Sequence, residues 1–128
     1  MIEARSVNAG PLKLRISQEG GASIVRLSGE LDLANAGVVE RELQLALADG
    51  NGRVVLDLGD LTFIDSTGIA LIVRAWQRVD AAAGNGGEGG LVLCCQNEQV
   101  RRVLEVTGLE HSLRVVATRD EAIAALRG

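Results

Sequence analysis

The strongest constraint on the fold is a repeated alternation between short apolar runs and segments with helical spacing. Residues 54–58 (Val-Val-Leu-Asp-Leu) are short, apolar and rich in β-branched side chains, which is typical of a buried strand. A helix is predicted over about residues 67–82, where the apolar residues that recur at helical spacing are Ile69, Ile72, Val73, Trp76 and Val79. A strand followed closely by a helix is the unit from which parallel sheets are built.

The same alternation continues on both sides of this unit. Residues 12–17 and 22–28 are predicted as two strands, joined by the Gly20-Gly21 turn into an antiparallel hairpin. The helix that follows begins at either Asp32 or Asn35, both of which are suitable caps. Its apolar stripe consists of Val39, Leu43, Ala46 and Leu47. Two more strands are predicted at 91–95 and 113–116, each followed by a helix, the first capped by Asn97 and the second by Thr118.

This order predicts a single α/β domain. We expect a mixed, mostly parallel five-stranded sheet, with an antiparallel edge strand at its N-terminal end and about four helices. Residues 1–11 contain the only proline and show no periodic pattern, so they are expected to be a lead-in to a domain over residues 12–128.

The candidate site is the segment Asp65-Ser-Thr-Gly68, between the strand at 54–58 and the helix that follows it. The functional surface of such a sheet lies at the carboxyl ends of its strands, where the loop at 29–32 also lies. Topology therefore predicts one acidic surface shared by Glu30, Asp32, Asp60, Asp65 and Ser66.

Each residue of this segment allows a structural and a functional interpretation. Ser66 is expected to cap the helix, a common role of serine, and to offer a hydroxyl group as well. Thr67 is a second hydroxyl, and Gly68 would let the backbone of another protein come close. Phe63 and Ile64 either contact a partner or fill the core beneath the loop, and the sequence leaves both possibilities open.

The composition excludes several other classes of function. The net charge is −4 and the basic residues are scattered, which argues against nucleic acid as a partner. No apolar run is long enough to cross a bilayer and the N-terminus has no signal core, so we expect a cytoplasmic protein without membrane insertion. The glycines of residues 84–90 formally match GxGxxG, but they follow a helix and precede a strand, unlike a dinucleotide-binding loop.

Metal, disulfide and catalytic chemistry are also not expected. Cys94 and Cys95 are adjacent in a predicted strand and point to opposite faces, so they are expected to be buried, reduced thiols. There is no cluster with metal-ligand spacing, and no cofactor is expected. A serine nucleophile needs a base, and the single histidine, His111, follows a predicted helix end, while the loop is not GxSxG. We therefore expect no enzymatic activity.

Four segments taken together resemble a known family. They are residues 29–32 (Gly-Glu-Leu-Asp), 54–58, 63–68 (Phe-Ile-Asp-Ser-Thr-Gly) and 103–109 (Val-Leu-Glu-Val-Thr-Gly-Leu). In this order the chain resembles the STAS domain over about residues 12–126, and in particular the bacterial anti-sigma factor antagonists.

The resemblance implies a partner-switching mechanism. The unmodified protein would bind an anti-sigma factor that is also a serine kinase of the GHKL ATPase fold, and would thereby free a sigma factor for stress-response or sporulation genes. Phosphorylation at Ser66, with Thr67 as the alternative acceptor, would abolish binding, and a PP2C-type phosphatase would restore it. Asp32 matches the acidic residue near the phosphorylation site. The residues expected to bind the partner are Glu30, Asp32, Phe63, Ile64, Asp65, Ser66, Thr67 and Gly68.

The same resemblance leaves a second function open. Some STAS domains sense ligands, bind nucleotides, act as scaffolds or serve as accessory subunits of lipid or anion transporters. The sequence does not choose between a monomer and a weak dimer.

Overall fold

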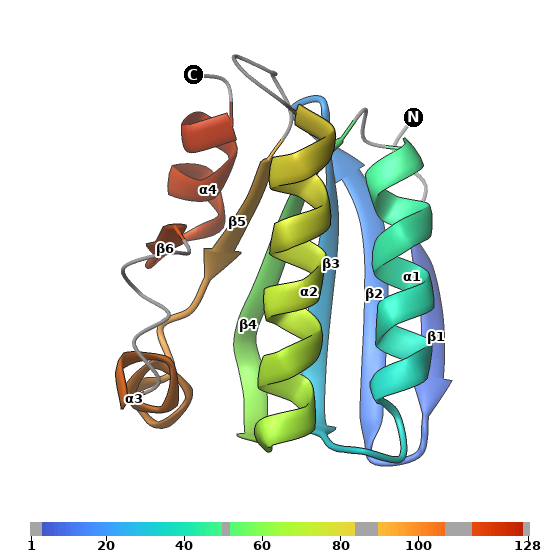
Figure 1. Cartoon of the computed structure of the whole chain (residues 1–128), viewed down its shortest axis with the longest axis vertical. Coiled ribbons are helices and arrows are strands. Elements are labelled where there is room, and N and C mark those ends of the chain that lie inside the picture. Colours follow the sequence, from blue (N-terminus) through green and yellow to red (C-terminus); the bar gives the residue numbers. More distant parts are fainter. Residues whose placement is uncertain (1–3, 50–51, 84–89, 107–113, 127–128) are drawn as a thin grey trace.

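A six-stranded sheet with its strands in sequence order forms the centre of the molecule (Figure 1). The computed structural model describes residues 4–49, 52–83, 90–106 and 114–126, with the backbone only for residues 79–83. The elements are β1 (Arg5–Ala9), β2 (Leu12–Glu19), β3 (Ala22–Leu31), α1 (Ala36–Asp49), β4 (Arg53–Ile64), α2 (Ser66–Ala83), β5 (Gly90–Cys94), α3 (Glu98–Val106), β6 (Arg114–Val116) and α4 (Arg119–Leu126).

The sheet is mixed, as the sequence predicted. Strands β1, β2 and β3 pair antiparallel, and β3 to β6 pair parallel. The sheet has one strand more than expected, because the N-terminal segment contains β1 at residues 5–9 instead of an unstructured lead-in. This edge strand has almost no periodic sequence pattern, since Val7 is its one residue packed against the main core. The rest of β1 is polar or small, and the pairing of Val7 with Leu14 sets its register.

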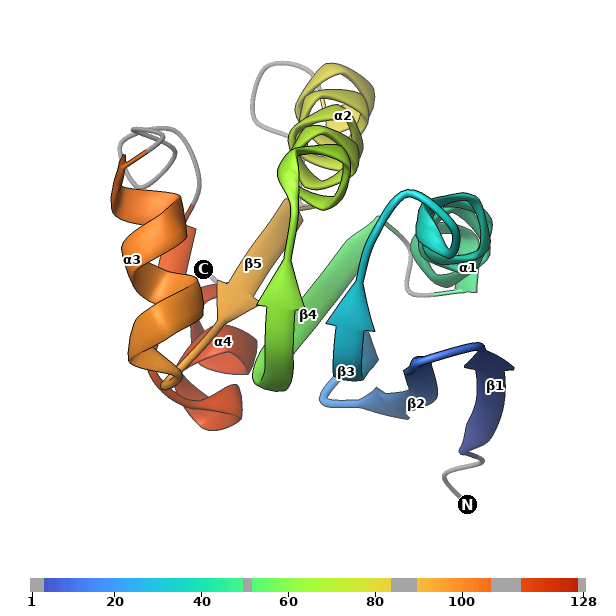
Figure 2. The same cartoon turned by 90° about the horizontal axis from the view of Figure 1, so that it is seen from below.

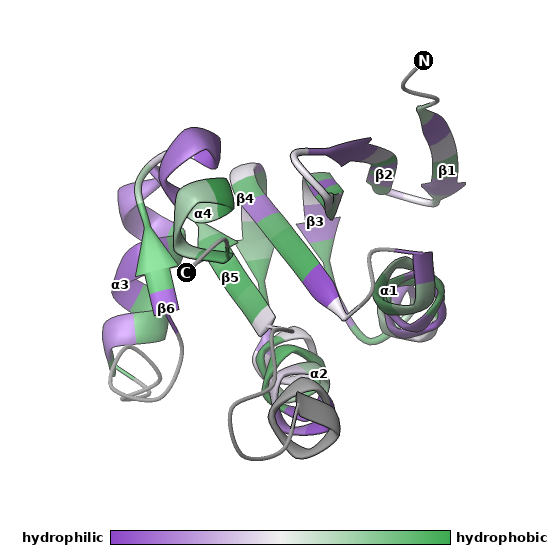
Figure 3. Ribbon diagram, turned by 90° about the horizontal axis from the view of Figure 1, so that it is seen from above, coloured by the Kyte–Doolittle hydropathy of each residue, from purple (hydrophilic) through white to green (hydrophobic). Residues whose placement is uncertain are grey.

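Helices cover the two faces of the sheet unequally (Figure 2). Helices α1 and α2 cover one face, and the large core lies beneath them, with fully buried residues such as Leu27, Leu56 and Leu71. Helix α4 packs on the opposite face against β4 and β5, where Ile24, Val55 and Val92 form a smaller core. Accordingly β4 and β5 are mostly hydrophobic along their length, whereas β2 carries hydrophilic stretches (Figure 3).

The helices follow the predicted periodicities with one shift. In α1 the stripe is confirmed, because Val39, Leu43 and Ala46 are buried and Leu47 is partly buried against the same core. In α2 the buried face is Gly68, Leu71, Ile72 and Ala75, whereas Ile69 and Trp76 are only partly buried and the side chain of Val79 lies outside the description. The buried face of α2 differs from the predicted one because Gly68, in the first turn of the helix, packs closely against Ile64 and Leu31. This contact determines which residues face the core one turn later.

Strand β4 is longer than predicted because it contains irregularities. Arg26 pairs with Asp57 and Ser28 with Asp60, so β4 contains one residue more than β3 over this interval. The extra residue forms a bulge, in which the Gly59 amide donates a hydrogen bond to the Asp57 side chain (2.9 Å). The strand then continues to residue 64, so residues 61–64, which follow the predicted strand at 54–58, form the end of β4 instead of a loop.

Candidate functional site

The junction between β4 and α2 consists of one residue, Asp65. Its carboxylate accepts a hydrogen bond from the Gly68 amide (2.9 Å), and its carbonyl oxygen accepts one from the Ile69 amide (3.1 Å). Asp65 is therefore the N-cap of α2. The expectation that Ser66 caps this helix is wrong, because the helix starts at Ser66 itself and the residue before it supplies the capping oxygen.

Ser66 is exposed on the first turn of α2. Its hydroxyl makes no hydrogen bond to any residue that the structure describes, so the Asp65 cap leaves it available. Thr67, the alternative acceptor, is half-buried. The first helical turn has amides without intrahelical acceptors and a partial positive charge, which favour an anion at this position.

Two neighbours of Ser66 support the junction from below. A side chain added at Gly68 would lie 2.8 Å from Ile64 Cγ1 and 2.9 Å from Leu31 Cγ. Gly68 is therefore needed for packing within this chain, and its role in letting the backbone of another protein come close stays a prediction. Ile64 is buried and fills the core beneath the junction, which decides one of the two alternatives left open above.

The loop after β3 lies next to this junction and is held by its own polar side chains. The Asp65 amide donates to the Leu31 carbonyl oxygen (3.3 Å), which ties the two connections together. Asp32 accepts from the amides of Ala34 (3.0 Å) and Asn35 (3.3 Å). Asn35 directly precedes α1 and is buried, and it donates to the Glu30 carbonyl oxygen (2.8 Å) and accepts from the Asp32 amide (3.0 Å). Asp32 thus holds the turn and Asn35 joins it to β3.

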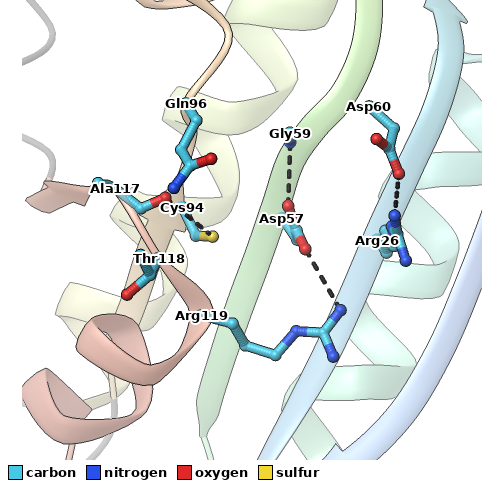
Figure 4. A pocket seen from close by; sticks show the side chains of 9 residues that line it. All are labelled: Arg26, Asp57, Gly59, Asp60, Cys94, Gln96, Ala117, Thr118 and Arg119. Atoms are coloured by element: carbon cyan, nitrogen blue, oxygen red, sulfur yellow. Dashed lines mark hydrogen bonds and ion pairs between the residues drawn. The ribbon is translucent and has the colours of Figure 1, made fainter.

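The acidic surface is smaller than the sequence predicted. The carboxylates of Asp32 and Asp65 are engaged with backbone amides. Asp60 forms an ion pair with Arg26 at a cavity on the open face of the sheet, so it does not belong to the surface around Ser66 (Figure 4). Glu30 is exposed, and within the described residues no Lys or Arg forms an ion pair with it, with Asp32 or with Asp65.

Two large apolar side chains are exposed at the same edge. Phe63, which pairs with Glu30 in the sheet, is 47% exposed, and Leu33, in the loop after β3, is 75% exposed. Sequence reasoning left Phe63 undecided and missed Leu33. The signal was present, because Leu33 lies between Asp32 and Asn35, both typical of turns and helix caps, and belongs to neither the strand nor the helix pattern.

A third connection, after β5, reaches the same strand. Asn97 caps α3 by accepting from the Gln99 amide (2.9 Å), as predicted, and it donates to the Leu61 carbonyl oxygen of β4 (2.7 Å). Because Leu61 lies in the irregular part of β4, this bond helps to hold the strand that ends at Asp65.

The remaining sequence predictions concern residues away from this edge. Cys94 and Cys95 are free and buried, as predicted. Burial, with the nearby Asp57 carboxylate, raises the pKa of Cys94 to about 12, and burial also raises the pKa of Cys95. Thr118 accepts from the Glu121 amide (3.1 Å), so the predicted cap of α4 is confirmed. His111 and most of the glycine-rich segment at 84–90 lie outside the described residues.

The part of the chain that the structure describes lacks two kinds of feature. No helix there is long and apolar enough to cross a membrane. No group of three or more His, Cys, Asp or Glu side chains there could hold a metal ion.

Together, the sheet and its carboxyl edge define a small mixed α/β domain that presents the exposed Ser66 hydroxyl and two exposed apolar side chains, Leu33 and Phe63, at that edge. The STAS domain family model matches residues 13–122. The chain belongs to the STAS domain family.

Named relatives match nearly the whole chain. BtrV of Bordetella bronchiseptica is 34% identical over 91% of this chain and 96% of its own length. The anti-sigma F factor antagonist of Paenibacillus polymyxa is 30% identical over 90% of this chain and 92% of its own length. Among solved structures, phosphorylated SpoIIAA of Bacillus has a similar fold, with a TM-score of 0.61 at 22% identity, covering 98% of this chain and 99% of that one.

Proposed function

We propose that this protein is an anti-sigma factor antagonist that works by partner switching, with Ser66 as the switch residue. In the unmodified state it would bind an anti-sigma factor and so release a sigma factor. The same anti-sigma factor, as a serine kinase of the GHKL ATPase fold, would phosphorylate Ser66 and end the complex. A PP2C-type phosphatase would reset the protein, and the cycle would take place in the cytoplasm.

The observation that carries this proposal is the state of the Ser66 hydroxyl. It is exposed and without a hydrogen bond inside the described chain, although it stands at the start of a helix, where serine commonly caps. Because Asp65 does the capping, the hydroxyl can enter the active site of a kinase without loss of helix stability.

The relatives give the proposal its partner class. A relative that matches over nine-tenths of this chain is named an anti-sigma F factor antagonist. SpoIIAA, which has a similar fold, has been solved in a phosphorylated form. Both facts are precedents for this assignment.

The surface around Ser66 supports binding of a protein rather than a small molecule. Leu33 and Phe63 are large, exposed apolar side chains at the same edge of the sheet as Ser66, and burial of such apolar area favours association with another protein. Glu30 supplies a charge beside Phe63. We therefore assign the contact surface to Glu30, Leu33, Phe63, Ser66 and Thr67, with Ile64 and Gly68 supporting it from beneath and Asp32 and Asp65 fixing its shape.

The local charges explain how one phosphate could end the interaction. A phosphoserine adds about −1.5 to −2 charges at neutral pH. Amides on the first turn of α2 can donate hydrogen bonds to the phosphate oxygens without a change of fold. However, no described cation is paired with the acidic groups of this edge, so the added charge would stay uncompensated. A partner that covers Ser66 would have to desolvate this charge, and a penalty of about 4 kcal/mol lowers affinity by roughly a thousandfold.

The experiment combines phosphorylation and binding. The protein is incubated with each GHKL-type anti-sigma kinase of its own organism and ATP, the modified residue is mapped by mass spectrometry, and affinity is measured before and after. We expect phosphate on Ser66, none on Ser66→Ala, and unchanged modification of Thr67→Val. Phosphorylation of Ser66→Ala would assign the acceptor to another hydroxyl. Tight binding of the phosphorylated protein would contradict the switch.

A further inference from the structure

The switch does not use a cavity of about 290 Å³ on the face of the sheet opposite α1 and α2 (Figure 4). Its location follows from strand alternation. Arg26 shares a face with Ile24, and Asp57 with Val55, both of which pack in the core beneath α4. Helix α4 packs against β4, β5 and β6 and leaves the same face of the neighbouring strand β3 uncovered. The cavity opens where the covered and uncovered parts of this face meet.

Charges of both signs line the cavity in two pairs. Arg26 pairs with Asp60, and Arg119 reaches the Asp57 carboxylate at 3.4 Å. Cys94 adds no charge at physiological pH, because burial raises the pKa of its thiol to about 12. The two cations and two carboxylates therefore cancel, and a ligand that carries both signs would be matched by the lining while a simple anion or cation would not.

The cationic side chains are not saturated by their present partners. The contacts of Arg119 with Asp57 (3.4 Å) and Glu19 (3.6 Å) are longer than the usual 2.7–2.9 Å or so of a charge-assisted hydrogen bond. The Arg26–Asp60 pair is close to half exposed on both sides, and such pairs contribute only about 0–1 kcal/mol. A ligand carboxylate can therefore compete for these guanidinium groups at small cost.

The opposite wall supplies uncharged polar groups. Gln96 is exposed, and its side chain makes no hydrogen bond to a described residue. The Ala117 carbonyl oxygen has only a long contact with the Cys94 thiol (3.9 Å) and can accept from an ammonium group. Figure 4 shows Gln96 and Ala117 on one side and Asp57 and Asp60 on the other, so a ligand between them would meet acceptors on both sides.

We propose that this cavity binds a small zwitterion of the α-amino acid type. The ligand carboxylate would lie against Arg26 and Arg119, and its ammonium group against Asp57, Asp60 and the Ala117 carbonyl oxygen. The volume is at the lower end of the range for ligand pockets, which suits a molecule of this size and is too small for a dinucleotide. The site lies on the other face of the sheet from α2, so the inference is independent of the switch.

The test uses the unmodified protein and the common L-amino acids, one at a time at millimolar concentration. Binding is followed by amide chemical shifts and the hits are measured by calorimetry. We expect at least one hit, with a Kd on the order of 0.1–1 mM. Its shifts should centre on Gly59, Cys94 and Thr118. The N-acetyl derivative and the decarboxylated amine of each hit, which lack one charge each, should bind at least about tenfold more weakly.

Variants locate the ligand. Arg26→Gln, Arg119→Gln and Gln96→Ala should weaken binding, the two arginine variants by about tenfold or more. Arg15→Gln is the matched control, because Arg15 pairs directly across from Arg26 and is exposed. Melting curves check that each variant folds, and Arg26 and Gln96 are exposed enough to be replaced safely. The proposal is overturned if no amino acid shifts these amides, if the singly charged analogues bind equally well, or if Arg15→Gln weakens binding as much as Arg26→Gln.

Discussion

The Asp65 carboxylate accepts the Gly68 amide at 2.9 Å, and this bond determines where α2 begins and leaves Ser66 free. Replacing Asp65 by Ala should therefore destabilise the fold by about 1 kcal/mol, the usual loss for an N-cap. Asp65→Asn should keep most of the stability, because its amide oxygen can still accept. The measurement is urea denaturation. Asp49→Ala, at the last residue of α1, is the control and should have little effect.

Gly68 should tolerate no larger side chain, although it lies in a helix. Alanine there would gain up to about 1 kcal/mol in helix propensity, but its methyl group would collide with Ile64 and with Leu31 at its branch point. Crowding in a packed core costs about 1–3 kcal/mol, so we expect net destabilisation in denaturant. Gly37→Ala in α1 is the matched control, because a Cβ there meets nothing within 4 Å. It should be neutral or stabilising, and equal effects of the two substitutions would contradict the packing argument.

Much of this fold can be predicted from periodicity, because buried strands and amphipathic helices carry strong patterns. The mixed sheet, the hairpin and the caps at Asn97 and Thr118 all followed from such patterns. β1 could not be predicted, since an edge strand with one side chain in the core has almost no pattern. The end of β4 was missed for a different reason. Gly59-Asp60 has the composition of a turn, yet pairing with β3 holds it in the sheet as a bulge.

The site was predicted in position and only partly in detail. Alternation and topology placed Ser66 at the carboxyl edge, but the choice between Asp65 and Ser66 as the cap depends on where the helix starts, to within one residue. Phe63 and Ile64 are adjacent in a strand, so one had to face the core, and the sequence could not say which. The engagement of Asp32 with backbone amides likewise depends on loop geometry.

Leu33 and Phe63 should contribute to binding of the anti-sigma factor without contributing to stability. Because both side chains are exposed, Leu33→Ser and Phe63→Ser should leave the free energy of unfolding within about 0.5 kcal/mol of wild type. Each should weaken the complex by about 1–2 kcal/mol, roughly 5- to 30-fold, in titration calorimetry. Leu45→Ser is the control, since Leu45 is about as exposed as Phe63 but lies on α1. The surface assignment fails if Leu45→Ser weakens the complex as strongly.

The buried thiols should make the protein less stable in alkali. The pKa of Cys94 is about 12 in the folded chain, against 9.0 for an ordinary thiol. Between these values the folded state binds the proton more tightly than the unfolded state, so the free energy of unfolding falls as the pH rises from 9 towards 12 and is unaffected below 9. The chain has no tyrosine and Lys13 is its only lysine, so few other groups titrate there. Denaturation of Cys94→Ala should show a smaller decline, and an identical decline would contradict the assignment.

The unexpected strand β1 is held to α1 by an ion pair that can be tested directly. Arg5 Nη1 lies 2.7 Å from Glu42 Oε1, and the Glu42 side chain is only 2% exposed. Arg5→Gln would leave a buried carboxylate whose other cation, Arg41, is 4.0 Å away. We expect a loss of about 1–3 kcal/mol in the free energy of unfolding, less than for a fully buried pair because Arg5 is half exposed.

Adding Glu42→Gln to Arg5→Gln should restore part of this loss, since burying a neutral amide costs less than burying an unpaired charge. Denaturation of the two single variants and the double variant measures this coupling. Arg15→Gln serves again as the control, and additive losses in the double variant would show that the pair does not hold β1 in place.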